Sequence, residues 1–391
     1  STISKIGGNL DVDQAIVQDI HATVSISYTA NATNSFDAGN NTNWVFPLFA
    51  GPNMYWVGGS GNWNDPSHWA FTSGGTAGSC IPGPGNDVFF DANSFTSSSQ
   101  TVTMNVSNAS CKSLSWTGAN YTPTFASSST ANTLKIYGSV TLISAMNLSY
   151  NGSVSFEAKT SGNTITSAGK VWPISGTPEI YFNGLGGSWT FQDAFATNSI
   201  ISLVNGTLNT NDQPVTCYYF ESQNSNVRAL NLGASTWVCT GYYWLVNNGT
   251  NLTLDAGTST IRMTYCCYTY FYGGNKTYNN VDFEGTNYPA SIQNNNTFNG
   301  TVTCSGDADF GSSNTFNGNL ILSPGRTYNF AGSSTQTLSA TGTLTANGTC
   351  GSYIMMSSAT TGTQANITKV GGNIIVDNTI IKYLNANVST G

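Results

Sequence analysis

The sequence predicts an all-β protein, most specifically a parallel β-helix, from its composition, its short strand-like segments and its internal repeats. Only 7% of the 391 residues are charged, whereas 12% are aromatic and 42 are glycine. An ordinary globular domain carries about 25% charged residues, and long helices need runs of Ala, Leu, Glu and Lys that are nearly absent here. Because aromatic residues recur along the whole chain, the polar composition indicates strands and turns and not disorder.

A short rhythm in the second half of the chain sets the expected length of one coil. Triplets of the form Thr-(Tyr/Phe)-Asn begin at residues 277, 297, 315 and 327, at gaps of 20, 18 and 12. Between them lie short alternating segments such as NLTLDAG and GNLILSPG, divided by turn residues. This spacing fits coils that stack about 4.8 Å apart, with Asn, Thr and aromatic side chains in ladders along the axis. Tandem β-sandwiches remain the alternative, because they also contain short strands with regular turns.

The chain opens and closes with copies of one segment. Residues 1–25 and 365–389 are identical at 11 of 25 positions at an offset of 364, including the GGN triplets at 7–9 and 371–373. The match predicts a tandem repeat, and the chain is expected to be a window cut from a longer array. Four parts follow in order: 1–25, the end of a preceding repeat; 26–53, a polar connector; 54–120, a Trp- and Cys-rich opening and cap; and 121–391, the β-helix body and closing segment.

The opening stretch YWVGGSGNWNDPSHWA, residues 55–70, contains Trp56, Trp63 and Trp69. We interpret these residues as a cap, because the bare end of a coil stack exposes apolar side chains and unpaired backbone groups that bulky aromatics can cover. The glycines and the Asp-Pro pair in this stretch suit tight turns. The alternative is a carbohydrate site, in which the three indoles would present flat faces to sugar rings.

The eight cysteines are dispersed, without a CxxC pair, and only two histidines accompany them. This pattern argues against a zinc site and favours disulfides in an oxidising, extracellular setting. Cys80 and Cys111 are the first predicted pair, because both lie in the Trp-rich segment. Cys217 and Cys239, 22 residues apart, are expected on neighbouring turns and form the second candidate pair.

Close carboxylate pairs are the weak candidates for a metal. Asp87 with Asp91, and Asp307 with Asp309, have the oxygen chemistry of Ca²⁺ ligands, but neither pair matches an EF-hand loop or a calcium-binding nonapeptide. Solvated turn residues are therefore the default interpretation, and no other cofactor is expected. His68 has no nucleophile motif near it, so the sequence predicts no enzyme.

Charge and hydropathy exclude two classes of partner. The net charge is −7, and the 11 Lys and Arg residues form no basic patch, which argues against nucleic acid binding. No run of about 18 apolar residues exists that could span a membrane. A β-helix polysaccharide lyase or hydrolase is the enzymatic alternative, but its acidic polymer would need basic partners, and Arg228, Arg262 and Arg326 are isolated along the chain.

The opening (residues 55–118) and the closing segment (350–386) resemble a recurrent unit of giant cell-surface β-helix repeat proteins of Bacteroidetes. The resemblance implies cargo of the type IX secretion system, with an adhesin or filament role at the cell surface. The predicted function is therefore a structural tandem repeat of an extracellular fibre or adhesin, with identical chains as partners. A repeated carbohydrate-binding module that contacts surface glycans is the alternative.

Overall fold

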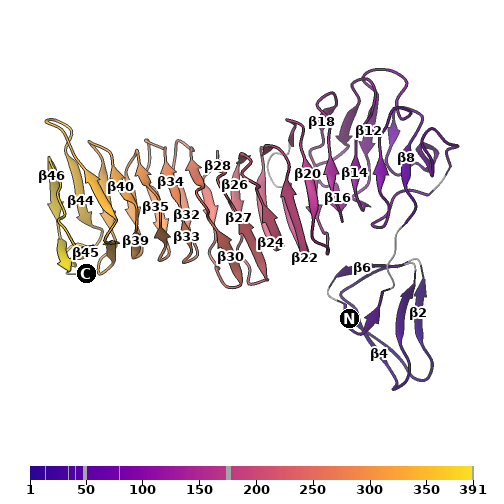
Figure 1. The fold of residues 1–391 in the computed structure, drawn as a ribbon, viewed down its shortest axis with the longest axis horizontal. Coiled ribbons are helices and arrows are strands. Elements are labelled where there is room, and N and C mark those ends of the chain that lie inside the picture. The colour runs from indigo at the N-terminus through magenta and orange to yellow at the C-terminus, as the bar shows by residue number, and fades with distance from the viewer. Residues whose placement is uncertain are drawn as a thin grey trace. The chain divides into compact units, whose positions relative to one another are not determined.

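The computed structural model describes residues 1–13, 15–33, 35–39, 41–46, 51–78, 80–172 and 178–389. It is nearly all-β, with 49% strand and 1% helix, and its strands form a parallel β-solenoid of about 17 turns in total (Figure 1). The predicted parallel β-helix is confirmed. The alternative prediction of tandem β-sandwiches is wrong, because the strands of successive coils pair in parallel. Among the described strands, β8 and β10 form the one antiparallel pair. Within the described residues, no helix is long and apolar enough to cross a membrane.

The chain forms two compact units, residues 1–164 with 184–187, and residues 165–183 with 188–391. The first unit holds an N-terminal segment, the Trp-rich opening and several coils. The N-terminal strands are β1 (Thr2–Lys5), β2 (Leu10–Asp13), β3 (Ile16–Gln18), β4 (His21–Val24), β5 (Ala30–Thr33), β6 (Phe36–Gly39) and β7 (Trp44–Val45). The elements that follow are β8 (Met54–Trp56), β9 (Gly61–Asn62), the 3-10 helix η1 (Pro66–His68), β10 (Trp69–Ala70), β11 (Val88–Phe89), β12 (Thr101–Met104), β13 (Asn108–Cys111), β14 (Leu114–Ser115), β15 (Thr124–Ser127), β16 (Thr133–Ile136), β17 (Val140–Thr141), β18 (Asn147–Ser149) and β19 (Ser153–Phe156).

The second unit stacks its strands into three parallel ladders, and β20 (Asn163–Thr166) crosses the boundary before them. The first ladder contains β22 (Ile180–Phe191), β24 (Ile200–Asn209), β26 (Tyr219–Glu221), β29 (Tyr243–Leu245), β32 (Thr269–Tyr272), β35 (Ala290–Gln293), β38 (Ala308–Phe310), β41 (Thr327–Phe330), β44 (Ile354–Ser358) and β46 (Thr379–Lys382). The second contains β21 (Val171–Trp172), β23 (Phe195–Thr197), β25 (Val215–Cys217), β28 (Thr236–Cys239), β31 (Thr260–Met263), β34 (Asn280–Phe283), β37 (Val302–Cys304), β40 (Asn319–Leu322) and β43 (Thr343–Ala346). The third contains β33 (Thr277–Tyr278), β36 (Thr297–Phe298), β39 (Asn314–Phe316), β42 (Thr335–Leu338), β45 (Ala365–Val370) and β47 (Leu384–Ser389), and it is preceded by β27 (Arg228–Asn231) and β30 (Leu252–Asp255).

Alternation along each strand builds the core of the second unit. In β31 the side chains of Ile261 and Met263 are buried, whereas those of Thr260 and Arg262 face outward. Residues in register on successive strands then stack along the axis, as Phe220, Trp244 and Phe271 do in β26, β29 and β32. An interior coil of this unit therefore buries its inward apolar side chains against the coils before and after it.

Three of the four Thr-(Tyr/Phe)-Asn triplets lie on stacked strands of one ladder. Tyr278, Phe298 and Phe316 are in register on β33, β36 and β39, and all three are fully buried. The fourth triplet, which begins at Thr327, lies on β41 in the first ladder and pairs with β38. A gap of 12 residues is shorter than one coil, so the chain has not returned to the same ladder. Polar ladders also occur, since the Asn317 side chain donates a 2.8 Å hydrogen bond to Asn299 Oδ1.

The two copies of the repeated segment have the same local structure. Thr2 pairs with His21 between β1 and β4, and Asn366 pairs with Asn385 between β45 and β47, which is the same register at an offset of 364. The segment predicted as a connector holds β5, β6 and β7 within its described residues. β5 pairs with β2 and β6 pairs with β3 to form a further coil, and β7 then pairs with β5.

Candidate functional site

The predicted cap is an aromatic cluster in the first unit. Trp56 and Trp69 are opposite each other in the antiparallel pair β8–β10, and their ring centroids lie 5.0 Å apart in an edge-to-face arrangement. The ring of Trp63 packs edge-to-face on Trp69, also at 5.0 Å. Phe90 contacts all three indoles and stacks at 3.9 Å on Trp116, a residue of the next coil. Trp56, Trp63 and Trp69 are at most 1% exposed.

The polar atoms of two indoles in this cluster bond to nearby backbone. Trp56 Nε1 donates to the Gly59 carbonyl at 2.6 Å, and Trp69 Nε1 donates to the Trp63 carbonyl at 2.7 Å. His68 stacks on Trp56 at 4.6 Å and donates from Nδ1 to the Val57 carbonyl at 2.8 Å. The three indole faces are therefore covered by protein, which favours the cap interpretation over a carbohydrate site at these residues.

Asp65 and two glycines shape the cap loop. The Asp65 carboxylate accepts hydrogen bonds from the Ser67 hydroxyl and backbone N–H, and these bonds lower the pKa of Asp65. They also fix the start of η1, whose last residue is His68. Gly59 has φ +80°, a conformation that favours glycine, and a Cβ on Gly61 would overlap the His68 ring.

The calcium candidates lie at two separate places and are hydrogen-bonded within the protein. Asp87 forms a 2.9 Å ion pair with Lys112, and Asp91 accepts a 2.9 Å bond from the Asn93 backbone. Asp307 accepts from the Thr327 N–H at 2.8 Å, and Asp309 accepts from the Asn329 amide at 2.9 Å. Within the described residues, no group of three or more His, Cys, Asp and Glu could hold a metal ion.

The cysteines carry free thiols in this structure. Of the predicted pair Cys80–Cys111, Cys80 is exposed and Cys111 is fully buried, and a disulfide between them stays a prediction. Cys217 and Cys239 are in register on β25 and β28, on neighbouring turns as the sequence predicts. Both are buried, and Trp237 Nε1 lies 3.1 Å from the Cys217 sulfur. A disulfide between them remains a prediction.

Seven tyrosines on successive coils of the second unit form a cluster, here called the tyrosine face. Tyr219, Tyr243 and Tyr270 lie at equivalent positions of β26, β29 and β32, with ring centroids 5.6 and 5.3 Å apart. Each is half-buried, so part of every ring is accessible to solvent. The other members, which contact these rings or one another, are Tyr218, Tyr242, Tyr265 and Tyr272.

Two carboxylates adjoin the tyrosine face. Glu221 follows Tyr219 on β26, and its Oε1 accepts a 3.0 Å bond from the Ser202 hydroxyl. Burial, and to a lesser degree the charge of Glu221, raises the pKa of Glu179 to about 6, although a hydrogen bond from Tyr181 acts in the opposite direction. Burial also raises the pKa of Tyr219 to about 12, so its hydroxyl stays protonated at neutral pH. The face thus combines aromatic rings, hydroxyl donors and carboxylate acceptors.

Glu179 is expected to make stability depend on pH in a defined direction. Because its pKa rises from 4.5 to about 6 on folding, the folded chain binds the proton more tightly, and this contribution to stability is lost as pH rises through that window. After allowance for partial exposure, Glu179→Gln should raise the free energy of unfolding by about 1 kcal/mol at pH 7 and change it little at pH 4. Urea unfolding of both proteins at the two pH values measures this difference. Equal differences at both pH values would contradict the expectation.

Sequence reasoning missed the tyrosine face, although the sequence carries a signal for it. The Tyr-Tyr pairs at 218–219 and 242–243 are 24 residues apart, which is about one coil. Tyr270 continues the row at the next coil. Once a coil period is known, aromatic pairs that recur at that period and alternate with buried positions indicate an outward aromatic row.

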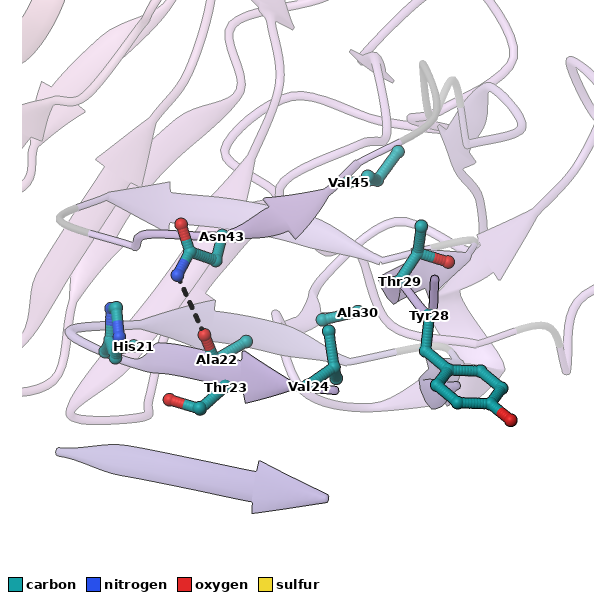
Figure 2. Close-up of a pocket in the computed structure, with 9 residues that line it drawn as sticks. All are labelled: His21, Ala22, Thr23, Val24, Tyr28, Thr29, Ala30, Asn43 and Val45. Atoms are coloured by element: carbon teal, nitrogen blue, oxygen red, sulfur yellow. Dashed lines mark hydrogen bonds between the residues drawn. The ribbon is translucent and has the colours of Figure 1, made fainter. Parts of the chain in front are cut away.

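A hollow lies in the N-terminal segment of the first unit. It is a cavity of about 280 Å³ between β4 and the chain at residues 28–30 and 43–45, and Figure 2 shows the residues that line it. Across it the Asn43 amide donates a 3.1 Å hydrogen bond to the Ala22 carbonyl. The lining mixes polar side chains with the apolar Ala22, Val24, Ala30 and Val45, and it contains no Asp, Glu, Lys or Arg.

Comparisons with known proteins add no relative to this picture. No protein family model, no curated protein and no solved structure matches the chain.

Proposed function

We propose that this chain is a structural repeat unit of an extracellular, cell-surface fibre or adhesin, built from identical chains and secreted by the type IX route of Bacteroidetes. The observation that carries the proposal is the segment duplicated at a distance of 364 residues, which adopts the same strand register in both places. Units that share a coil of the same structure at their junction can be joined in series, because each coil contacts only its neighbours.

Other features agree with a mechanical or adhesive role and not a catalytic one. The cap residues are buried among one another, and the candidate carboxylates bond to backbone or to neighbouring side chains. A chain with 7% charged residues also meets little electrostatic repulsion from identical chains that lie beside it. Weak contacts that recur in every unit would then add up along the fibre.

Cryo-electron microscopy of the native, cell-derived material tests this proposal. We expect a regular filament whose axial repeat corresponds to one 364-residue unit, and whose cross-section shows how many chains associate. Discrete monomeric particles would contradict it.

The tyrosine face supports a second candidate function, the binding of a neutral or cationic glycan. Rows of accessible aromatic rings suit stacking against sugar rings, and Glu179 and Glu221 can accept hydrogen bonds from sugar hydroxyls or amines. Within the described residues the face lies beside carboxylates, which disfavours acidic polysaccharides. This candidate places the carbohydrate contact on the half-buried tyrosines of the tyrosine face and not on the three buried tryptophans.

If the tyrosine face binds glycans, replacing Tyr243, its central member, with alanine should weaken binding about tenfold or more. A glycan array identifies the ligand, and titration calorimetry then compares the variant with the parent chain. Tyr353→Ala is the matched control, because Tyr353 is 51% exposed and lies on another part of the second unit. Equal loss in both variants, or no glycan bound by the parent chain, would reject this candidate.

A further inference from the structure

The C-terminal coil of the second unit presents an open apolar face. Ile374, Val376, Ile381 and Leu384 line a cavity of about 190 Å³ there, with Ile367 and other side chains of the preceding coils beneath them. Ile381 is 52% exposed. Although this unit is otherwise rich in strands, the described residues 374–376 belong to no strand. The face therefore has backbone and apolar side chains available for a further coil.

The copy of this face in the N-terminal segment is covered. Leu10–Asp13, which correspond to residues 374–377, form β2 because they pair with Ala30–Thr33 of β5. The next strand, β3, pairs with β6 in the same way. Ala22 N–H donates to the Thr42 carbonyl at 3.0 Å, and Thr42 N–H donates to the Ile20 carbonyl at 3.1 Å. The described residues of 26–45 thus cover this copy, with β5 and β6 paired to β2 and β3, and β7 paired to β5.

Burial at equivalent positions shows what the covering coil does. Ala22 is fully buried, whereas its counterpart Ala386 is exposed. Val17 is 7% exposed, whereas its counterpart Ile381 is 52% exposed. At these two positions an apolar side chain is enclosed in the N-terminal copy and open in the C-terminal copy, whereas Leu10 and Ile374 are half-buried in both.

The backbone turns of the open C-terminal copy have the same conformation as those of the covered N-terminal copy. Gly7 and Gly8 have φ values of +70° and +86°, and Gly371 and Gly372 have +64° and +78°. Asp19 and Tyr383, at equivalent positions, both adopt the left-handed region at +57° and +52°. Because the turns agree, a coil that fits residues 1–25 would meet the same surface at 365–389.

We propose that the C-terminal face binds a coil with the sequence of residues 26–45, supplied by another copy of the unit. The coil docks by parallel strand pairing, with Ala30 beside Ile374, Thr33 beside Asp377 and Thr42 bonded to Ala386. This inference rests on the proposed function, for which it defines the joint between consecutive units.

Specific groups on both sides recognise each other. Thr29 N–H is bonded to the Asn9 side chain at 3.1 Å, and Asn373 retains this asparagine in the C-terminal copy. The Asn31 amide donates to Asp11 at 2.7 Å, but Ile375 replaces that aspartate in the C-terminal copy. The C-terminal joint therefore lacks one hydrogen bond, and Ile375→Asp should restore it.

The test extends the full chain so that residues 26–46 follow Ser389 in place of Thr390 and Gly391. A second extension with the same residues in shuffled order is the control. Hydrogen exchange is then measured at the amides of Ile374 and Ala386, whose counterparts Leu10 and Ala22 donate to Thr29 and Thr42. We expect exchange at both amides to slow at least 100-fold in the native extension alone. Equal exchange in the two extended chains would overturn the proposal.

Substitutions in the face identify the register. Ala386→Glu should abolish the protection, because its counterpart Ala22 is fully enclosed under the covering coil. Asn387→Glu is the matched control on the same strand, and it should leave protection within about twofold, since its counterpart Thr23 stays exposed beside that coil. Ile375→Asp should increase protection a few-fold. Equal effects of Ala386→Glu and Asn387→Glu would contradict the proposed register.

Failure of the joint and failure of the proposed function give different results. Slow exchange in the core strands of the second unit, with no added protection at Ile374 and Ala386, would reject the joint and leave a structural repeat intact. Rapid exchange in the core strands themselves would contradict a stable structural unit, whatever happens at the joint.

Discussion

Arg228→Met is expected to destabilise the second unit by about 3 to 5 kcal/mol, one of the two largest effects that the structure indicates. Arg228 is only 2% exposed. Its guanidinium group donates mainly to backbone carbonyls, whereas a buried cation is usually paired with a carboxylate. Its Nη1 donates to the carbonyls of Asn226 and Thr250, both at 2.9 Å. The remaining acceptors are the Ser222 hydroxyl and the carbonyls of Ser222 and Asn248. Methionine fills similar space but leaves these acceptors without their donor.

The measurement is the free energy of unfolding in urea, together with hydrogen exchange on β27 and β30. Arg262→Met is the matched control, because Arg262 pairs with Glu284 at 2.6 Å on the surface, where its side chain is 42% exposed. Removal of an exposed ion pair should cost less than about 1 kcal/mol. If the two substitutions cost the same, the carbonyl network around Arg228 does not hold neighbouring coils together.

The fold could be predicted because its signals are local and repeated. Alternation within four-residue strands places residues such as Ile261 inside, and the recurring Thr-Phe-Asn triplets give the coil period. The triplet at 327 shows the limit, since the same letters lie on another ladder when the spacing is shorter than a coil. Which ladder a strand joins depends on the chain length between strands, and loop lengths vary along this sequence.

Features that depend on distant partners were harder to predict. Residues 26–45 have the composition of a polar connector. They nevertheless include strands, because β2 and β3 offer backbone partners to β5 and β6. Small residues such as Ala30 and Ala32 are enough to fill the inward positions of β5. The pair Cys80–Cys111 was inferred from proximity in sequence and stays a prediction, with Cys80 exposed and Cys111 buried. The neighbouring positions of Cys217 and Cys239 were predicted from the coil period, which explains why that inference succeeded.

The position of the aromatic cluster could be predicted from the sequence, but its packing could not. A Trp-rich stretch at the start of a repeat suggests a covered end, yet the sequence alone leaves a ligand site open as an alternative. What distinguishes the two is the mutual packing of side chains from three coils, such as Trp69, Phe90 and Trp116, and this packing arises only in the folded chain.

Trp69→Ala is the second large effect, with an expected loss of about 3 to 5 kcal/mol from the free energy of unfolding of the first unit. Trp69 is fully buried and contacts the rings of Trp56, Trp63 and Phe90. Alanine would remove these contacts and leave the Trp63 carbonyl without its 2.7 Å hydrogen bond. A cavity of that size between rigid aromatic rings can collapse only partly, so most of the lost contact energy is not recovered.

Near-ultraviolet circular dichroism and urea unfolding measure this loss, because packed indoles dominate the signal of the cap. Phe71→Ala is the matched control, since Phe71 is only two residues away but 50% exposed, and its truncation should change stability by less than about 0.5 kcal/mol. The same pair of variants separates architecture from ligand binding at the opening stretch. A cap predicts that Trp69→Ala loosens the first unit with or without sugars present. Unchanged unfolding together with lost glycan binding would instead assign the tryptophans to a carbohydrate site and reject the cap.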